Sequence, residues 1–253
     1  MIHETAIVSP SAKLGKNVHV GPWSFIGDDV EIGDDTIIHS HVVVKGPTII
    51  GANNIIFQFS SVGEDCQDKK YNGEPTRLEI GDNNIIRENV TIHRGTIQDQ
   101  SLTKIGSNNL FMAYVHVAHD CVVGNNTIFA NNASIAGHVH VGDWAILGGM
   151  VGVHQFCHIG AHSFCGLNSM VVKDVPPYVL ASGQSAKPHG INSEGLKRRG
   201  FSAEDILAIK RAYKEVYRKG NSIDEALANI PDSSDAISAF KQFIIDSPRG
   251  IVR

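Results

Sequence analysis

Apolar residues recur at every sixth position along most of this chain. Counted in steps of six from Ile2, the repeat runs through residues 2–62, 80–92 and 105–171 and holds 26 positions. All of them are aliphatic or aromatic except Cys165. A period of six fits neither the 3.6-residue period of a helix nor the two-residue period of a strand. It predicts a triangular coil of three short strands, in which one side chain per face points inward and the next coil stacks on top.

Glycines occupy a fixed place in this repeat. They follow the inward residue in many coils, as at Gly15, Gly21 and Gly27, where we expect them to assist the corners. The chain holds 25 glycines and only 7% aromatic residues, which favours a core of many thin layers. The pattern resembles the hexapeptide-repeat family, whose members fold as left-handed parallel β-helices. The left hand is implied by that resemblance, because general crossover rules favour the right.

The repeat also divides the chain into parts. Residues 1–185 are expected to form the β-helix, with loop insertions near 68–79 and 98–104, where the register breaks. Long loops on a rigid scaffold often carry function. After two consecutive prolines, Ser202 and then the pair Ser222 and Glu225 give helix-capping signals ahead of apolar residues at helical spacing. We therefore predict a small C-terminal α-helical domain over residues 190–253.

Charge and composition narrow the function classes. Residues 1–185 hold 10 Lys/Arg against 17 Asp/Glu, a net −7, whereas residues 186–253 hold 12 against 9, a net +3. The basic residues are densest in 196–219, which indicates either a solvated helix face or a dock for an acidic partner. We expect no nucleic-acid partner. No apolar run approaches the roughly 18 residues of a transmembrane segment, no secretion signal is visible, and a cytoplasmic location is expected.

A candidate site follows from the repeat alone. His119, Gly137 and Gln155 are 18 residues apart in an unbroken register, so they form one column on neighbouring coils, with a rise of about 4.8 Å per coil. They follow the inward residue by two places and should point outward. An imidazole beside a bare glycine backbone and a carboxamide is a candidate catalytic cluster. The alternative is a stack of unrelated surface residues.

The cysteines and histidines give mainly negative expectations. The four cysteines have no C-x-x-C spacing and fall at interior positions of the repeat, which argues against a cysteine nucleophile. Some hexapeptide-repeat proteins are zinc enzymes that use three histidines, two of them five residues apart. No two of the 13 histidines here have that spacing. We predict no metal site and no cofactor.

Several non-repetitive segments resemble one family closely, the UDP-N-acetylglucosamine acyltransferases of lipid A synthesis. The resemblance spans nearly the whole chain, including both predicted loops and the C-terminal region. The segments that carry it are 67–71, 73–77, 91–96, 118–121, 137–139, 153–157 and 194–201. The family transfers a 3-hydroxyacyl chain from acyl carrier protein directly to the sugar 3-hydroxyl, the first step of lipid A biosynthesis.

The resemblance implies roles for the column. His119 matches the family's general base, Asp120 the carboxylate that orients it, and Gly137 the backbone N–H that stabilises the oxyanion. A sugar hydroxyl attacks poorly, so a base within hydrogen-bond reach is the main chemical requirement. No covalent acyl-enzyme is needed.

Substrate contacts are likewise implied by the resemblance. It assigns the sugar, the nucleotide with its phosphates, the region near the thioester and the end of the acyl groove to different parts of the chain. It assigns contacts with the sugar to Asp68, Lys70, His116 and His138. It assigns contacts with the nucleotide to Asn192, Glu194, Arg198 and Arg199, with Gln155 close by. His154 is assigned to the thioester and Leu167 to the end of the acyl groove. A helix-edge salt bridge is the structural alternative for the two arginines.

The resemblance also implies partners. The family forms homotrimers with the active site between neighbouring subunits, and the basic stretch at 196–219 becomes the dock for the acidic acyl carrier protein. Leu167 is a departure, because family members that use longer chains carry glycine there. We therefore expect a shorter acyl chain, of about ten carbons, since pocket size selects chain length.

Two other functions remain open. One is a related N-acyltransferase that acts on an amino-sugar nucleotide, although that enzyme normally carries an additional N-terminal uridine-binding domain and here the repeat starts at Ile2. A 3-amino sugar acceptor would need the base less. The other is a non-catalytic nucleotide-sugar-binding scaffold, which leaves the loop at 68–79 unexplained.

Overall fold

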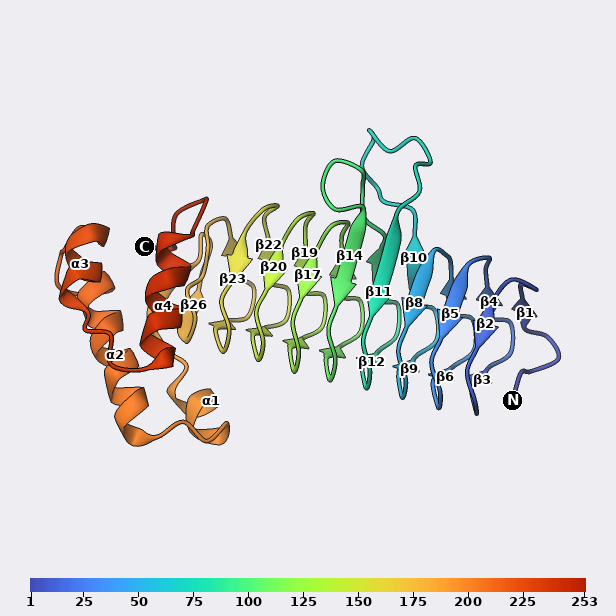
Figure 1. Cartoon of the computed structure of the whole chain (residues 1–253), viewed down its shortest axis with the longest axis horizontal. Helices are drawn as coiled ribbons and strands as arrows, with labels where there is room; N and C mark the ends of the chain where they lie inside the picture. Colours follow the sequence, from blue (N-terminus) through green and yellow to red (C-terminus); the bar gives the residue numbers. More distant parts are fainter.

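The computed structural model describes residues 1–253. The chain forms a long rod of stacked coils, with a cluster of helices at its C-terminal end and the N-terminus at the other (Figure 1). Each complete coil contributes one strand to each of three sheets. The sheets hold nine, eight and ten strands, because β25, β26 and β27 follow the last complete coil. Within the coils, strands three apart in the chain are neighbours and run parallel, as the 18-residue spacing predicts.

The strands are mostly two residues long. The first sheet holds β1 (Ile7–Val8), β4 (Phe25–Ile26), β7 (Val43–Val44), β10 (Ser61–Glu64), β13 (Thr91–His93), β16 (His116–Val117), β19 (Ser134–Ile135), β22 (Gly152–Val153) and β25 (Met170–Val171). The second holds β2 (Lys13–Leu14), β5 (Val30–Ile32), β8 (Thr48–Ile50), β11 (Arg77–Ile80), β14 (Leu102–Ile105), β17 (Val122–Val123), β20 (His140–Val141) and β23 (His158–Ile159). The third holds β3 (His19–Val20), β6 (Ile37–Ile38), β9 (Ile55–Ile56), β12 (Ile85–Ile86), β15 (Leu110–Phe111), β18 (Ile128–Phe129), β21 (Ile146–Leu147), β24 (Phe164–Cys165), β26 (Val179–Ser182) and β27 (Lys187–Ile191).

The interior is the column of sixth residues that the sequence predicts. From Val20 onward every one of these positions is buried, which makes 23 of the 26. The exceptions are Ile2, Val8 and Leu14, which lie in the first coil and have no coil beneath them. Burying an aliphatic side chain contributes about 1.5–3 kcal/mol before chain entropy is counted. The stacked ladder is therefore the main source of the rod's stability.

The glycines act differently from the expectation. Of those that follow the inward residue, only Gly63 has positive φ, at 79°. The left-handed corner residues are instead mostly Asn, Asp, His and aromatic side chains, such as Asn17 and Asp35. The glycines allow neighbouring coils to approach closely. A Cβ on Gly33 would lie 2.5 Å from the carbonyl carbon of Gly51, and one on Gly21 would lie 2.7 Å from that of His39. The prediction of glycine-assisted corners was wrong for all of these glycines except Gly63, because the others serve the contact between coils.

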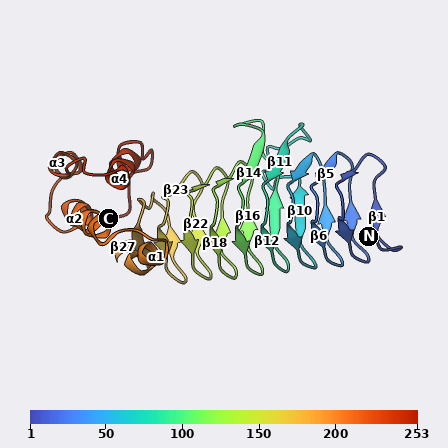
Figure 2. The ribbon, with the colours of Figure 1, turned by 60° about the horizontal axis from the view of Figure 1, so that its bottom comes forward.

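Two loops leave the coils side by side on one edge of the rod, between β10 and β11 and between β13 and β14 (Figures 1 and 2). They span residues 65–76 and 94–101. The ranges predicted from the repeat, 68–79 and 98–104, began and ended too late. Their ends ran into β11 and β14, which are four residues long and pair with each other from their first residues. Counting in sixes could not detect the second inward residue that each of these longer strands carries.

The C-terminal region has four helices, α1 (Ser193–Arg198), α2 (Ala203–Tyr217), α3 (Ile223–Asn229) and α4 (Asp235–Ile245). Ser202 caps α2 and Ser222 with Glu225 forms the predicted capping box of α3. Before the helices, β27 pairs antiparallel with β26, so the predicted boundary at 185–190 falls within a hairpin of the third sheet. None of the helices is long and apolar enough to cross a membrane.

The end of the chain returns to the rod. The backbone N–H of Val252 donates to the Asp174 carbonyl at 2.8 Å, and the Ser247 hydroxyl donates to the Asp174 carboxylate at 2.6 Å. Apolar residues of the helices and of the coils belong to one continuous buried cluster. The helices are therefore fixed against the last coil.

Candidate active site

A groove of about 750 Å³ lies along the outer face of the first sheet, over β16, β19, β22 and β25. The loop 65–76 contributes Gln67, Asp68 and Lys69 to its wall. The other polar groups that line it come from the coils: His93, His116, His119, Ser134, His154 and Gln155. The column of His119, Gly137 and Gln155 predicted from the spacing therefore lies in one groove.

His119, which lines the groove, forms a hydrogen-bonded pair with Asp120, which does not. Nδ1 of His119 lies 2.9 Å from Oδ2 of Asp120, and the two side chains are 15% and 1% exposed. Thr96 donates to the same carboxylate twice, through its hydroxyl at 2.6 Å and its backbone N–H at 2.8 Å. Burial acts to raise the pKa of the Asp120 carboxyl, but the hydrogen bonds from His119 and Thr96 outweigh it, so this pKa lies below its ordinary value.

This arrangement fixes the tautomer of the neutral imidazole. An ionised carboxylate only accepts hydrogen bonds, so Nδ1 of His119 carries the proton and Nε2 is left as the acceptor. Asp120 sits at a corner with φ of 58°, a left-handed conformation that Asp tolerates better than most residues. The corner thus turns the carboxylate back towards the preceding side chain.

Gly137 packs directly against the imidazole on the neighbouring coil. A Cβ at this position would lie 2.5 Å from Cε1 and 2.7 Å from Nε2 of His119. The backbone carbonyl of His119 also accepts from the His138 N–H at 3.1 Å. The Gly137 N–H itself makes no hydrogen bond within the chain. A free backbone donor therefore adjoins the acceptor nitrogen of His119.

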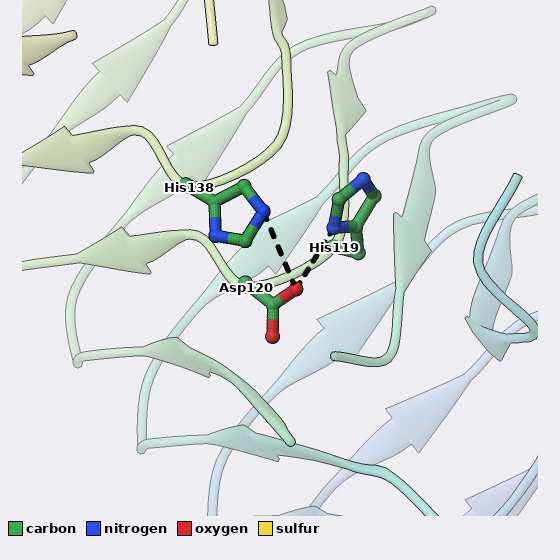
Figure 3. Close-up of side chains that lie close together, drawn as sticks. All are labelled: His119, Asp120 and His138. Atoms are coloured by element: carbon green, nitrogen blue, oxygen red, sulfur yellow. Dashed lines mark hydrogen bonds and ion pairs between the residues drawn. The ribbon is translucent and has the colours of Figure 1, made fainter. Parts of the chain in front are cut away.

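His138 completes the cluster around Asp120 (Figure 3). Its Nε2 lies 3.8 Å from Oδ2 of Asp120, and its Nδ1 lies 2.9 Å from Oδ2 of Asp99 in the second loop. The ring stacks on Phe156 with centroids 4.3 Å apart. Figure 3 shows both imidazoles turned towards one carboxylate oxygen. His138 therefore contacts Asp99 of the second loop, the ring of Phe156 and the carboxylate of Asp120.

The same three residues are the chain's one candidate for a metal-binding group, with ligand atoms within 4.8 Å of one another. Two imidazoles and a carboxylate suit a transition metal. Binding an ion there would, however, replace the hydrogen bond between His119 and Asp120, and both oxygens of Asp120 already accept from Thr96. The donor set is therefore accounted for by hydrogen bonding, and the expectation of no metal remains a prediction.

Two further histidines lie at the floor of the groove. His116 is hydrogen-bonded through Nδ1 to the Thr91 hydroxyl at 2.7 Å, and burial lowers its pKa to about 4, with the neighbouring histidines adding to the effect. His93 packs edge-on against it, with centroids 5.2 Å apart, and burial lowers its pKa too. The sequence assigned no role to His93. The loop inserted after it breaks the 18-residue count, so spacing could not place it beside His116.

The remaining predicted residues divide into two groups. Asp68, His154 and Gln155 line the groove, whereas Lys70 does not, although its backbone N–H donates to the Asp68 carboxylate at 2.9 Å. The others lie outside the groove of a single chain. Leu167 is a 72% exposed corner residue, and Asn192, Glu194, Arg198 and Arg199 surround α1.

The residues around α1 have structural partners of their own. Asn192 caps the helix, and its amide also donates to the His162 carbonyl at 3.0 Å. The Arg199 guanidinium lies 5.3 Å from the centre of the Trp144 ring. The helix-edge salt bridge considered for the two arginines belongs instead to Lys197, whose Nζ lies 2.9 Å from Glu194. Arg198 has no carboxylate partner within the chain.

The cysteines are not available for chemistry. All four are buried free thiols, which confirms the expectation from their place in the repeat. Burial raises the pKa of Cys121 and Cys165 to about 12 and that of Cys157 to about 11. A nucleophilic cysteine needs a thiolate near neutral pH. None of these thiols supplies one.

Comparison with known proteins identifies the family. A profile described as "Udp N-acetylglucosamine O-acyltransferase; Domain 2" matches residues 174–252, and one described as "Bacterial transferase hexapeptide (six repeats)" matches residues 11–46 and 102–137. The acyl-[acyl-carrier-protein]–UDP-N-acetylglucosamine O-acyltransferase of Thiobacillus denitrificans is 59% identical over 255 residues, with 100% of this chain and 99% of that protein covered. The chain belongs to the UDP-N-acetylglucosamine O-acyltransferase family.

Solved structures of the UDP-N-acetylglucosamine O-acyltransferase family agree. The protein of Francisella novicida has a TM-score of 0.98 at 44% identity, with 100% of this chain and 94% of that chain covered. That of Moraxella catarrhalis has a TM-score of 0.96 at 48% identity, with 100% and 99% covered. The predicted fold, a left-handed parallel β-helix followed by a small C-terminal helical region, is confirmed.

Proposed function

We propose that this chain transfers a 3-hydroxyacyl group from acyl carrier protein to the 3-hydroxyl of UDP-N-acetylglucosamine, the first step of lipid A biosynthesis. Full-length relatives at 58–59% identity carry the name of this acyltransferase. The observation that supports the chemistry best is the His119–Asp120 pair in the groove, with the bare backbone of Gly137 against the imidazole.

In this mechanism His119 is the general base. Its Nε2 takes the proton of the sugar hydroxyl as the hydroxyl oxygen attacks the thioester carbon. Asp120, ionised and held by Thr96, stabilises the resulting imidazolium. The tetrahedral intermediate then collapses, the C–S bond breaks, and the thiol leaves with the proton that His119 returns. A positioned base of this kind contributes roughly 10²–10⁴-fold.

Gly137 supplies the oxyanion donor. Its N–H has no acceptor within the chain, and the missing side chain lets the thioester approach His119. A backbone donor aimed at the developing negative charge is worth about as much as the base. Both effects need the carbonyl carbon to lie between the His119 imidazole and the Gly137 amide.

Different residues contact the two substrates. In UDP-N-acetylglucosamine, the sugar is contacted by Asp68, Lys70, His116 and His138, and the nucleotide by Asn192, Glu194, Arg198 and Arg199, with Gln155 close by. In the acyl donor, the thioester lies beside His154. Arginine's planar fork suits a pyrophosphate. The acidic carrier protein docks on the basic stretch 196–219, where steering by charge raises the rate of encounter.

We propose a homotrimer as the active form, because the residues assigned to the nucleotide do not line the groove of a single chain. The nucleotide residues around α1 lie outside the groove that holds His119. The third sheet also presents an outward row of apolar side chains, one per coil, which a neighbouring subunit would cover. The row consists of Ile37, Ile55, Ile85, Leu110, Ile128, Ile146 and Phe164. A cytoplasmic location goes with this proposal, since unpaired cysteines are typical of a reducing compartment.

The test is acyl transfer from 3-hydroxyacyl carrier protein to UDP-N-acetylglucosamine by the intact chain and by His119→Ala. We expect product from the intact chain and a loss of at least about a hundredfold in the variant, because the base is removed. His140→Ala is the matched control, an exposed histidine on the second sheet outside the groove. No product from the intact chain would favour first an amino-sugar acceptor and then a non-catalytic scaffold. Undiminished transfer by His119→Ala would exclude it as the base.

A further inference from the structure

The loop 65–76 carries the proposed sugar contacts Asp68 and Lys70, yet it projects beyond the coils (Figure 1). Its residues are mostly polar and part of it lines the groove. A loop of this kind orders itself only at an entropic cost, so binding through it depends on contacts that fix it beforehand. Those contacts converge on one side chain, that of Arg94.

Arg94 is the first residue after β13 and lies beneath the base of the loop. Its side chain is only 7% exposed. Nη1 donates to the carbonyl of Gly63 at 2.6 Å, and Nη2 donates both to the carboxylate of Asp65 and to the hydroxyl of Tyr71 at 3.2 Å. One guanidinium therefore holds the end of β10, the first residue of the loop and its middle.

Tyr71 extends this anchor to the far side of the loop. Its hydroxyl lies 3.1 Å from the Glu74 carbonyl and 3.2 Å from Oδ1 of Asp65, so it can donate to either while it accepts from Arg94. The residues between Asp65 and Tyr71 include those that enter the groove. Their positions are thus set from both sides by the same guanidinium.

We infer that Arg94 is a positioning residue for the acceptor sugar: it holds the loop 65–76 in the conformation in which Asp68 and its neighbours face the groove. This inference rests on the proposed function, which assigns the sugar to that loop. Arg94 makes no hydrogen bond or ion pair with His119 or Asp120. The catalytic carboxylate is oriented by Thr96, two residues further along, so loop anchoring and base orientation are separate tasks of one short segment.

Arginine suits this role because two of its nitrogens donate to acceptors on three different residues. Its fork offers five N–H donors in fixed directions, whereas a lysine ammonium is a single compact centre. Arg94→Lys therefore keeps the charge and loses part of the fork. Tyr71→Phe removes only the hydroxyl, and Arg77→Lys serves as the control, because Arg77 is an exposed arginine that closes the loop and pairs with Glu79 alone.

The experiment measures acyl transfer and amide hydrogen exchange of the full-length chain. For Arg94→Lys we expect KM for UDP-N-acetylglucosamine to rise about 10- to 100-fold, the range for losing hydrogen bonds to a charged group. The kcat, the KM for the acyl donor and the melting temperature should stay near those of the parent. Tyr71→Phe should change the same constant less, and Arg77→Lys should not change it.

Hydrogen exchange separates this inference from the proposed function. We expect faster exchange in residues 65–76 of Arg94→Lys, with the exchange of the coils unchanged. If Arg94→Lys exchanges faster in this loop but the parent chain transfers no acyl group, the role of Arg94 in holding the loop is retained and the proposed function is refuted. A fall in kcat with KM unchanged, or faster exchange throughout the rod, would overturn the inference, because Arg94 would then act on the dyad or on global stability.

Discussion

At the scale of single residues, function depends on what stands at the outer corners of the coil. Corner positions do not build the core, so their side chains are free to differ from coil to coil. Asp120 and His138 occupy equivalent corners of adjacent coils, both with positive φ, and both contact His119. Leu167 occupies another corner and is 72% exposed, close to Gly149 of the coil before it.

We predict that Leu167 limits the length of the acyl chain. Leu167 lies outside the groove of a single chain, but in the proposed trimer it would adjoin the end of the acyl chain. Its bulk there should favour a donor of about ten carbons, since an added methylene costs roughly 1–3 kcal/mol where a pocket is full. Leu167→Gly should raise kcat/KM for a fourteen-carbon donor more than for a ten-carbon donor. Competition assays with both donors measure this ratio. Equal rates with the two donors in the parent protein would refute the hypothesis.

At the scale of the element, the 18-residue length of a coil determines which residues are neighbours on adjacent coils. The 18-residue spacing predicted the His119 column because no insertion falls between Ile105 and Val171. It failed where loops interrupt the count, so the place of His93 and the bounds of the two loops were not predicted. It could not reveal Thr96, Asp99 or Arg94 either, because the contacts of a loop depend on its path through space.

The close contact between coils predicts the effect of Gly137→Ala. The added Cβ would lie 2.5 Å from Cε1 of His119, so the imidazole must turn away from Asp120. We expect transfer to fall by at least about a hundredfold, as a misplacement of 1 Å can cause, while the melting temperature changes little.

Gly149→Ala is the matched control for this change. Gly149 holds the same place in its coil, but the nearest atom to its added Cβ is Cδ1 of Leu167 at 3.2 Å, the end of a flexible side chain. This variant should keep most of its activity with a ten-carbon donor. Equal losses in the two variants would mean that a methyl group at this corner disturbs the coil, and that His119 is not its specific target.

At the scale of the whole molecule, the three faces of the rod differ in chemistry. The outward side chains of the third sheet are apolar from β6 to β24, whereas those of the second sheet include Lys13, Glu31, Glu79 and Lys104. The sequence contained this contrast, but it becomes visible only when each strand is assigned to its sheet. The proposed trimer would use such a face, and the proposed site would depend on that trimer.

Ile85→Arg tests this dependence. Ile85 is 38% exposed in the middle of the apolar row, so a buried charge there should dissociate the trimer. Light scattering after gel filtration should show a smaller species, and acyl transfer should fall with it. Ile49→Arg is the control, because Ile49 is 48% exposed on the second sheet. A monomeric Ile85→Arg protein with full activity would contradict a site shared between subunits.

The open first coil has a consequence for how the rod comes apart. Each coil contacts only its neighbours, so stability propagates in one dimension from coil to coil. The terminal coil, where Ile2 is 50% exposed, has a neighbour on one side only and should fray first, whereas the opposite end is sealed by the helices and the returning C-terminus. Amide exchange should therefore slow from the N-terminus inward. The His119 column lies more than halfway along that gradient, so several coils can unfold before unfolding reaches His119.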